Sequence, residues 1–316
     1  MPWNRPLIIG LLVVLLAISW WRLQPEDYEV RRSQLMMGTV VEIVAEGQDS
    51  NKLEVAVDAA FAEMTRLDQL LSRHHQQSDV SRLSKSDSGT EVSIETAEVI
   101  ALGLDVAQRS GGAFDLTLGR LKALWGFGQE SPAVPDRNAL SAALNGIGLA
   151  ALSLHGQQVN KRLSPLQVDL GGIAKGYAVD RAITVLKDRG VTRGWQGSEC
   201  RNRQLGQHPE LPGRPERPWR IGIQHPRHKE ALLETVQVSD RAVVTSGDYE
   251  RFFEEDGVRY HHIFDPESGL PARGCQSVTI IADSVALADA LATAVFVLGP
   301  AAGLQLLTQY PETEGL

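Results

Sequence analysis

The segment 284–298, SVALADALATAVFVL, constrains the fold of this chain more than any other stretch of the sequence. From Val285 onward, its only polar side chains are those of Asp289 and Thr293. A helix that is apolar on every side has to be buried, so this segment predicts a helix inside the molecule. Because Asp289 and Thr293 are four residues apart, both oxygens project from one face of that helix.

The buried carboxylate needs a partner, since an isolated charge in an apolar interior is costly. A carboxylate and a hydroxyl presented together suit a hard cation such as Mg²⁺, which prefers oxygen ligands. An Asp paired with a buried Arg, together with a Thr bonded back to its own helix, would give the same pattern. The residues alone leave both interpretations open.

The overall composition is that of an ordinary globular protein. With 316 residues, 29 Gly, 15 Pro and 2 Cys, it excludes a disordered chain, a collagen-like repeat and a disulfide-built miniprotein. The net charge of −8, without a long basic run, argues against nucleic acid as the primary partner. Cys200 and Cys275 form no CxxC, which excludes a metal-thiolate site and leaves one disulfide open.

The N-terminus carries an apolar run without charges at residues 7–21. This run is shorter than the roughly 20 residues that span a bilayer, but it matches the core of a signal peptide. Ala17 and Ser19 offer a cleavage site of small residues, whereas Trp20 and Trp21 are typical of an uncleaved anchor at the membrane interface. We therefore expect a targeting or anchoring segment that is either cleaved or retained.

The rest of the chain predicts a single folded domain. We expect the signal or anchor segment and its linker at residues 1–33, and the domain at residues 34–316. Apolar spacing predicts helices at 53–71 and 95–109. Short apolar or β-branched runs predict strands at 39–45, 166–170, 219–223, 234–238, 242–245, 259–264 and 277–282. The stretch 197–218, interrupted by Pro and Gly, is expected to be a surface loop. This order of elements predicts an α+β fold with a largely antiparallel sheet.

A glycine turn between a short strand and a helix lies in the segment 168–180, VDLGGIAKGYAVD. Gly171 and Gly172 would let backbone N–H groups approach an anion, and Lys175 would add a full charge in the first turn of the helix. The segment is neither a Walker A motif nor a GxGxxG motif. A tight turn followed by a surface lysine explains the spacing at least as well.

A candidate general base lies in the segment 260–269, YHHIFDPESG. His262 follows a predicted strand, and an imidazole is well suited to deprotonate a hydroxyl near neutral pH. Since His261 and His262 alternate along the strand, only one of them can face a site. A purely structural histidine would give the same pattern.

Aromatic side chains in the segment 113–128 either line a pocket for a flat heteroaromatic ring or belong to the core, namely Phe114, Trp125 and Phe127. Together, a cation site, a glycine turn, a base and aromatic walls would describe phosphoanhydride chemistry on a nucleotide-like substrate.

The sequence resembles the ApbE family of FAD:protein FMN transferases in several long motifs that occur in the same order. The likeness covers nearly everything after about residue 34. Its motifs are MMGTVVEI (36–43), FDLTLGRLKALWGFG (114–128), VDLGGIAKGYAVD (168–180), PWRIGIQHP (218–226), VVTSGDYERFF (243–253), HHIFDPESG (261–269) and ADALATAVFVLG (288–299). The resemblance implies a single ApbE/T-fold-like α+β domain with flanking helices.

The resemblance also implies Mg²⁺-dependent transfer of FMN from FAD to a Ser or Thr hydroxyl of a target protein, with release of AMP. It implies that Asp289, Thr293 and the backbone carbonyl of Gly172 bind the metal and that His262 deprotonates the acceptor hydroxyl. Family members contact FAD at the positions of Met37, His74, Phe114, Asp115, Leu116, Asp169, Lys175 and Phe264. The alternatives are an FAD pyrophosphatase, which gives FMN and AMP, and a non-catalytic flavin-binding protein.

Three departures from the family pattern concern the site. The GG[DE] segment that usually precedes the PWRIGI strand is missing from 194–219, where Cys200 is unexplained. Ala292 stands where some relatives have a second Asp, which predicts one tight metal site. His74 replaces an aromatic residue that is common in relatives, which weakens stacking.

For partners, the resemblance implies FAD and target proteins of membrane redox complexes, such as sodium-translocating NADH:quinone reductases, that carry an acceptor Ser or Thr. Together with the N-terminal apolar run, it implies an exported protein on the periplasmic side of the bacterial inner membrane. Its N-terminal segment would contact that membrane.

Overall fold

The structure is a computed structural model that describes residue 10 and residues 28–127, 129, 132–162, 165–198, 201–205 and 218–316. Most of the expected anchor or signal segment lies outside the described residues, as does Cys200. Within the described ranges, no helix is both long enough and apolar enough to cross a bilayer. Cys275 carries a free thiol, so the disulfide that the sequence left open is not formed.

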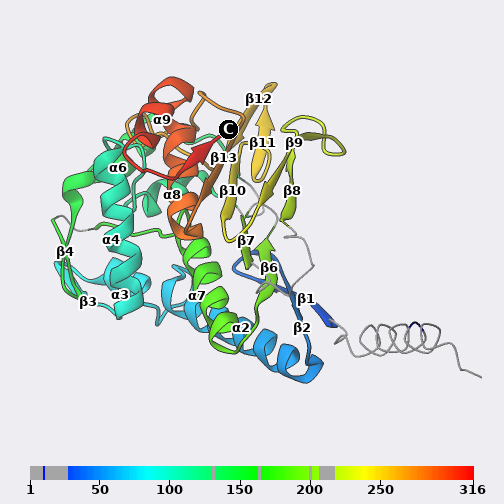
Figure 1. Ribbon diagram of the computed structural model, residues 1–316. Coiled ribbons are helices and arrows are strands. Elements are labelled where there is room, and N and C mark those ends of the chain that lie inside the picture. Colours follow the sequence, from blue (N-terminus) through cyan, green and yellow to red (C-terminus); the bar gives the residue numbers. More distant parts are fainter. Residues whose placement is uncertain are drawn as a thin grey trace, which may run out of the picture.

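A seven-stranded sheet forms the centre of the fold, in the order β1-β2-β6-β7-β10-β13-β14 (Figure 1). Every strand pairing in this sheet is antiparallel. The predicted α+β fold with a largely antiparallel sheet is therefore confirmed. The strands are β1 (Tyr28–Met36), β2 (Thr39–Gly47), β6 (Arg193–Ser198), β7 (Arg201–Leu205), β10 (Ala242–Gly247), β13 (Ser277–Ala282) and β14 (Glu314–Gly315).

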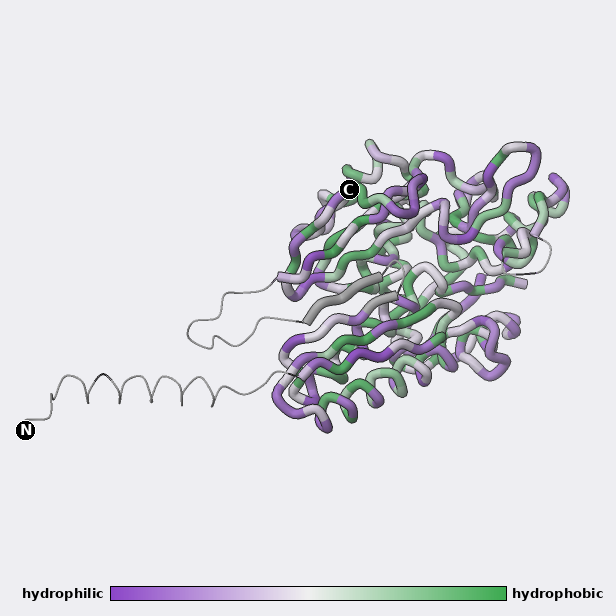
Figure 2. The backbone as a smooth tube through the Cα atoms, turned by 90° about the vertical axis from the view of Figure 1, so that its right-hand side faces the viewer, coloured by the Kyte–Doolittle hydropathy of each residue, from purple (hydrophilic) through white to green (hydrophobic). Residues whose placement is uncertain are grey.

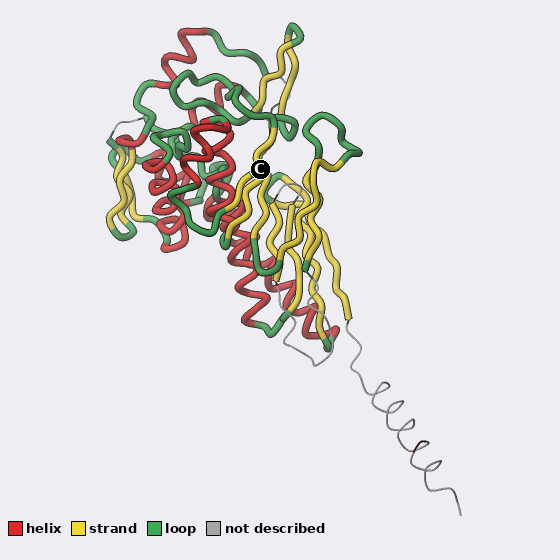
Figure 3. The backbone as a smooth tube through the Cα atoms, turned by 45° about the horizontal axis from the view of Figure 1, so that its top comes forward, coloured by secondary structure: helices red, strands yellow, loops and turns green. Residues whose placement is uncertain are grey.

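Most helices gather on one side of this sheet, as Figure 3 shows. They are α2 (Ser50–Leu71), α3 (Asp79–Lys85), α4 (Ile94–Arg109), α5 (Gly119–Trp125), α6 (Arg137–Leu144), α7 (Ala174–Asp188), α8 (Val285–Leu298) and α9 (Pro300–Leu307), with a 3₁₀ turn at Leu149–Ala151. Smaller sheets join β3 (Gly89–Glu91), β4 (Leu152–His155) and β5 (Gln158–Lys161), and β11 (Phe252–Glu255) with β12 (Val258–His261).

The other face of the sheet is covered by the hairpin of β8 (Trp219–Gln224) and β9 (Leu232–Val238). Val243 of β10 and Ile281 of β13 form a small buried cluster with Val238 of this hairpin. The neighbouring residues Val244 and Ile280 face the helices and join the main core. Because both faces are buried here, consecutive residues of these strands are apolar, as at 243–244 and 280–281. Figure 2 shows hydrophobic segments in the interior of the molecule.

Four sequence predictions differ from the structure. Residues 28–33, expected as part of the linker, belong to β1 because their backbone pairs with β2. Residues 166–170 form no ladder strand, because their backbone bonds to the irregular segment before α5: Asp169 N–H donates to Leu116 O and Gly119 N–H to Gln167 O. Within the expected loop at 197–218, residues 197–198 and 201–205 belong to β6 and β7, and residues 206–217 lie outside the described residues. The expected strand at 259–264 ends at residue 261, and Phe264 makes only an isolated bridge to Pro271.

Helix α8 is buried as its sequence predicts and packs on α7 as well as on β10 and β13. Gly176 of α7 permits this close approach, because a Cβ there would lie 2.5 Å from the carbonyl oxygen of Val285. Asp180, one turn further along α7, accepts hydrogen bonds from the Ser284 hydroxyl and from the N–H groups of Val285 and Ala286 at 2.8–3.0 Å. A carboxylate at this place also matches the positive end of the helix dipole.

Replacing Asp180 by Ala should lower the free energy of unfolding by about 2 kcal/mol, because the first turn of α8 loses three acceptor contacts and a charge. Urea unfolding followed by circular dichroism measures this loss. Asp188→Ala is the matched control, since Asp188 is exposed at the other end of α7 and should change stability little. Equal stability of the two variants would contradict a capping role for Asp180.

Candidate active site

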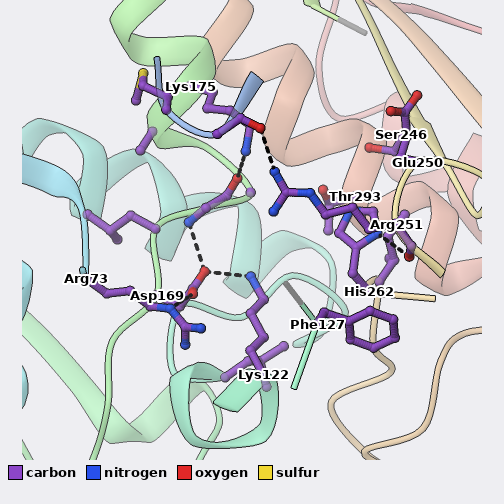
Figure 4. Close-up of a pocket in the computed structure, with 18 of the residues that line it drawn as sticks. Arg73, Lys122, Phe127, Asp169, Lys175, Ser246, Glu250, Arg251, His262 and Thr293 are labelled. Atoms are coloured by element: carbon purple, nitrogen blue, oxygen red, sulfur yellow. Dashed lines mark hydrogen bonds and ion pairs between the residues drawn. The ribbon is translucent and has the colours of Figure 1, made fainter. Parts of the chain in front are cut away.

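A cavity of about 490 Å³ opens between the start of α7, the end of β10 and the segments that follow α2 and β12 (Figure 4). Ten of the twelve residues that the sequence placed at the site line it: Met37, His74, Phe114, Asp115, Asp169, Gly172, Lys175, His262, Phe264 and Thr293. The other two, Leu116 and Asp289, lie buried behind its wall. Residues more than 200 positions apart in the sequence therefore meet in one place.

The two segments that carry the expected metal ligands, the glycine turn and α8, lie next to each other. A Cβ on Gly172 would lie 3.6 Å from Thr293 Oγ1, so the turn and the hydroxyl are close neighbours. Asp289 is fully buried one helical turn below Thr293, and its Oδ2 accepts the N–H of Gly176 at 3.2 Å. An all-oxygen set of one carboxylate, one hydroxyl and one carbonyl suits Mg²⁺.

The part of the alternative interpretation that concerns Thr293 is present in the structure. The Thr293 hydroxyl does donate to Asp289 O in its own helix, at 3.2 Å, but its oxygen keeps acceptor capacity toward the cavity. Asp289 Oδ2 accepts a hydrogen bond from a main-chain amide in the first turn of α7. Among the described residues, no group of three or more His, Cys, Asp and Glu side chains gathers as a metal centre. The expected magnesium site has only one carboxylate, with a hydroxyl and a main-chain carbonyl as its other ligands, so it is not a group of that kind.

The glycine turn ahead of α7 is held from both sides. Asp169 Oδ1 accepts the N–H of Gly171 at 2.9 Å, and Lys175 Nζ donates to Gly171 O at 3.0 Å. Lys122 Nζ lies 2.6 Å from Asp169 Oδ1, and Arg73 Nε lies 3.4 Å from Oδ2. Although burial alone would raise it, these two cations hold the pKa of Asp169 far below its ordinary value. The turn therefore lies among cationic side chains.

Of the adjacent histidines 261 and 262, His262 faces the cavity. His261 is buried, with its Nε2 2.8 Å from Ala272 O. The Nδ1 atom of His262 lies 3.3 Å from Arg251 O. Since a carbonyl oxygen can only accept, this contact favours the tautomer with a proton on Nδ1 and a free lone pair on Nε2. Desolvation, and then the nearby charges of Lys122 and Arg251, hold the pKa of His262 well below its ordinary 6.5. The ring is thus neutral near pH 7, as a base has to be.

The aromatic residues divide into cavity wall and core. Phe114, Phe127 and Phe264 line the cavity, whereas Trp125 is fully buried and donates its Nε1–H to Gly269 O at 3.0 Å. The sequence left both roles open for the segment 113–128, and the structure shows both. A flat ring would find apolar walls on this side of the cavity.

The two neighbouring residues Asp115 and Leu116, both expected to contact FAD, point in different directions. The Leu116 side chain does not line the cavity, because it packs against Gly103 of α4. A Cβ on Gly103 would lie 2.8 Å from the methyl groups of Leu116. Asp115 does line the cavity, and its Oδ1 accepts the Thr117 N–H at 2.6 Å while Oδ2 is buried without a hydrogen-bond partner. Burial raises the pKa of the Asp115 carboxyl. A ligand group that hydrogen-bonds to Oδ2 would satisfy it.

Sequence reasoning missed three cationic residues of the cavity wall, Arg73, Lys122 and Arg251. Arg251 Nη2 donates to Gly38 O at 3.2 Å and so connects the β1–β2 turn to the segment before β11. In that turn Met37 and Gly38 both have positive φ, 52° and 74°. The residues around each of these cations are of mixed character, so no local pattern marked them.

The comparisons with known proteins identify the family of this chain. The sequence model of the ApbE family matches residues 37–316. The chain is similar to the FAD:protein FMN transferase of Treponema pallidum (strain Nichols), with 33% identity over 314 residues that cover 91% of this chain and 84% of the relative. It is also similar to the Vibrio cholerae protein of that name, with 35% identity over 264 residues that cover 81% of this chain and 76% of the relative.

A solved structure extends the likeness to the fold. The crystal structure of the ApbE protein from Thermotoga maritima superposes with a TM-score of 0.81 at 36% identity, covering 92% of this chain and 94% of the other. The chain belongs to the ApbE family, a family of flavin transferases. It is an enzyme of the transferase class, for which FAD fits as the substrate.

Proposed function

We propose that this protein transfers the FMN half of FAD to a Ser or Thr hydroxyl of a target protein and releases AMP. The observation that carries the proposal is that His262 lines the same cavity as Gly172 and Thr293, while Asp289 lies buried one helical turn from Thr293. A base beside a cation site and a cationic glycine turn is the arrangement that phosphoryl transfer to a hydroxyl requires.

Asp289, Thr293 and the Gly172 carbonyl would hold Mg²⁺, and their hard oxygen atoms fit this ion. The ion, when bound, would supply neutralisation of the diphosphate oxygens and polarisation of the phosphorus. Asp289 fits this role because a fully buried carboxylate inside an apolar helix is stabilised by a cation. The position of Asp289 and Thr293 depends on Asp180, which holds the start of α8.

His262 Nε2 accepts the proton of the acceptor hydroxyl as its oxygen attacks the phosphorus of the FMN half. One P–O bond forms to the acceptor, the P–O bond to the AMP half breaks, and AMP leaves with the bridging oxygen. Lys175 and Lys122 stabilise the negative charge around the glycine turn. Phe127 and Phe264 offer apolar walls for the flavin ring.

We also propose that the protein works on the periplasmic side of the bacterial inner membrane, on subunits of membrane redox complexes. The apolar run at residues 7–21 supports this proposal, because it matches a signal peptide or an anchor. Fractionation of cells that express the full chain tests it, and recovery of the protein in the cytosolic fraction would contradict it.

An acceptor assay tests the proposed reaction. The purified full chain is incubated with FAD, Mg²⁺ and an acceptor domain that carries a flavinylation-type Ser or Thr, and the acceptor mass and the AMP released are followed over time. A mass gain of one FMN unit, with equimolar AMP, supports the transferase. Free FMN and AMP without acceptor labelling would indicate a pyrophosphatase that uses water. Intact FAD would indicate a flavin-binding protein without turnover.

A further inference from the structure

The carboxylate of Asp169 is paired with two cationic side chains at the cavity wall. It is only 8% exposed, and both of its oxygens have cationic partners. Lys122 Nζ lies 2.6 Å from Oδ1 and Arg73 Nε lies 3.4 Å from Oδ2. Figure 4 shows both side chains beside Asp169. Arg73 is held in turn, because its Nη1 donates to Gly119 O at 3.1 Å. The contact to FAD that the family resemblance implies for Asp169 is therefore better made by its partners.

The charges of this cluster sum to an excess of one positive charge. The single carboxylate of Asp169 neutralises either Lys122 or Arg73 but not both. The side chains of Lys122 and Arg73 are 27% and 26% exposed, so both cations still reach the cavity. A partly desolvated excess charge of this kind attracts an anionic ligand more strongly than a fully solvated lysine does.

Lys122 is directed at the glycine turn. Its Nζ lies 3.7 Å from the point that a Cβ on Gly171 would occupy, on the turn whose carbonyl Lys175 also contacts. Two lysines from different helices, α5 and α7, thus meet at one turn at the N-terminus of α7. An ammonium has three donors, and Asp169 engages only part of this capacity of Lys122.

We propose that Lys122 binds the diphosphate of FAD at the Gly171 turn, and that Asp169 and Arg73 are positioning residues that hold its ammonium there. This inference rests on the proposed function only for the identity of the ligand. The site itself follows from the ion pairs and the cavity. It assigns to Asp169 an indirect role, in place of a direct hydrogen bond to the substrate.

Binding measurements on the full chain separate this role from turnover. FAD, ADP and riboflavin are titrated by calorimetry, since ADP carries the diphosphate without the flavin and riboflavin the flavin without the diphosphate. Lys122→Met should weaken ADP and FAD binding by about 10- to 100-fold, the range of one lost hydrogen bond to a charged group, and leave riboflavin binding unchanged. Lys122→Arg should restore most of the loss. Lys187→Met, at the exposed end of α7, is the matched control and should bind all three ligands normally.

A double-mutant cycle tests the positioning role. Asp169→Asn alone should weaken ADP binding, but it should add little to Lys122→Met, because the group that it positions is then absent. Additive losses would overturn the indirect role of Asp169. Normal ADP binding by folded Lys122→Met, or an equal loss of riboflavin binding, would overturn the diphosphate site. ADP binding needs no acceptor protein. The binding results would therefore test the diphosphate site even if the proposed transfer reaction were not observed.

Discussion

Replacing His262 by Gln will reduce FMN transfer by roughly 10²- to 10⁴-fold, the contribution of a positioned general base. Glutamine keeps a similar size but cannot accept the proton of the acceptor hydroxyl. FAD binding, measured by calorimetry, should remain within about threefold, because the base acts on the acceptor. The acceptor mass assay gives the rate. Transfer at the wild-type rate would show that His262 is not the base.

The pH dependence of the wild-type rate adds a second readout for the same residue. A base acts in its deprotonated form, and the pKa of His262 is held well below its ordinary 6.5. The acid limb of the rate profile should therefore lie below pH 6.5, and the rate should be level from there to neutral pH. His155→Gln, an exposed histidine of β4, is the matched control and should keep both the rate and the profile.

Asp289→Asn is expected to abolish the response of the protein to Mg²⁺. In the wild-type protein, bound Mg²⁺ should stabilise the folded state by about 2.7 kcal/mol when its concentration is 100 times the dissociation constant. The amide of Asn has no charge to offer the ion, so the melting temperature of the variant should be the same with and without Mg²⁺. Transfer should fall by several orders of magnitude, since the charge of the diphosphate is then not neutralised.

The same variant distinguishes loss of metal from loss of fold. Without Mg²⁺, Asp289→Asn should be at least as stable as the wild type, because it removes a charge from an apolar helix. Direct titration with Mn²⁺, followed by electron paramagnetic resonance, should show one tight site in the wild type and none in the variant. Mn²⁺ binding of equal affinity in both proteins would contradict the metal site at Asp289.

Much of the fold follows from local patterns in the sequence. Strand β13 has its predicted bounds, 277–282, and the helix at 285–298 is buried because every side of it is apolar. The prediction failed at 166–170, because a five-residue stretch in which apolar and polar residues alternate does not specify its partner. Those residues bond to an irregular segment some 50 positions earlier in the chain. Pairing of this kind depends on tertiary contacts.

The candidate site could be predicted only where a motif carries its own chemistry. Asp289 and Thr293 stand out because they are polar in an apolar helix, and His262 because it lies between a strand and a turn. Lys122 and Arg73 give no such signal, because a lone basic residue is ordinarily solvated. Their role appears only when Asp169, 47 positions from Lys122, lies beside both.

By itself, the sequence determined the α+β elements, the buried α8 helix and the family, because periodicity, residue type and motif order are local properties. Only the tertiary structure decided which histidine faces the cavity, that Leu116 packs into the core, and that Asp169 is bound by two cations. The physical reason is that the charge, solvation and pKa of a side chain depend on what lies within a few ångströms of it. The fold sets those neighbours, and no local spacing in the chain encodes them.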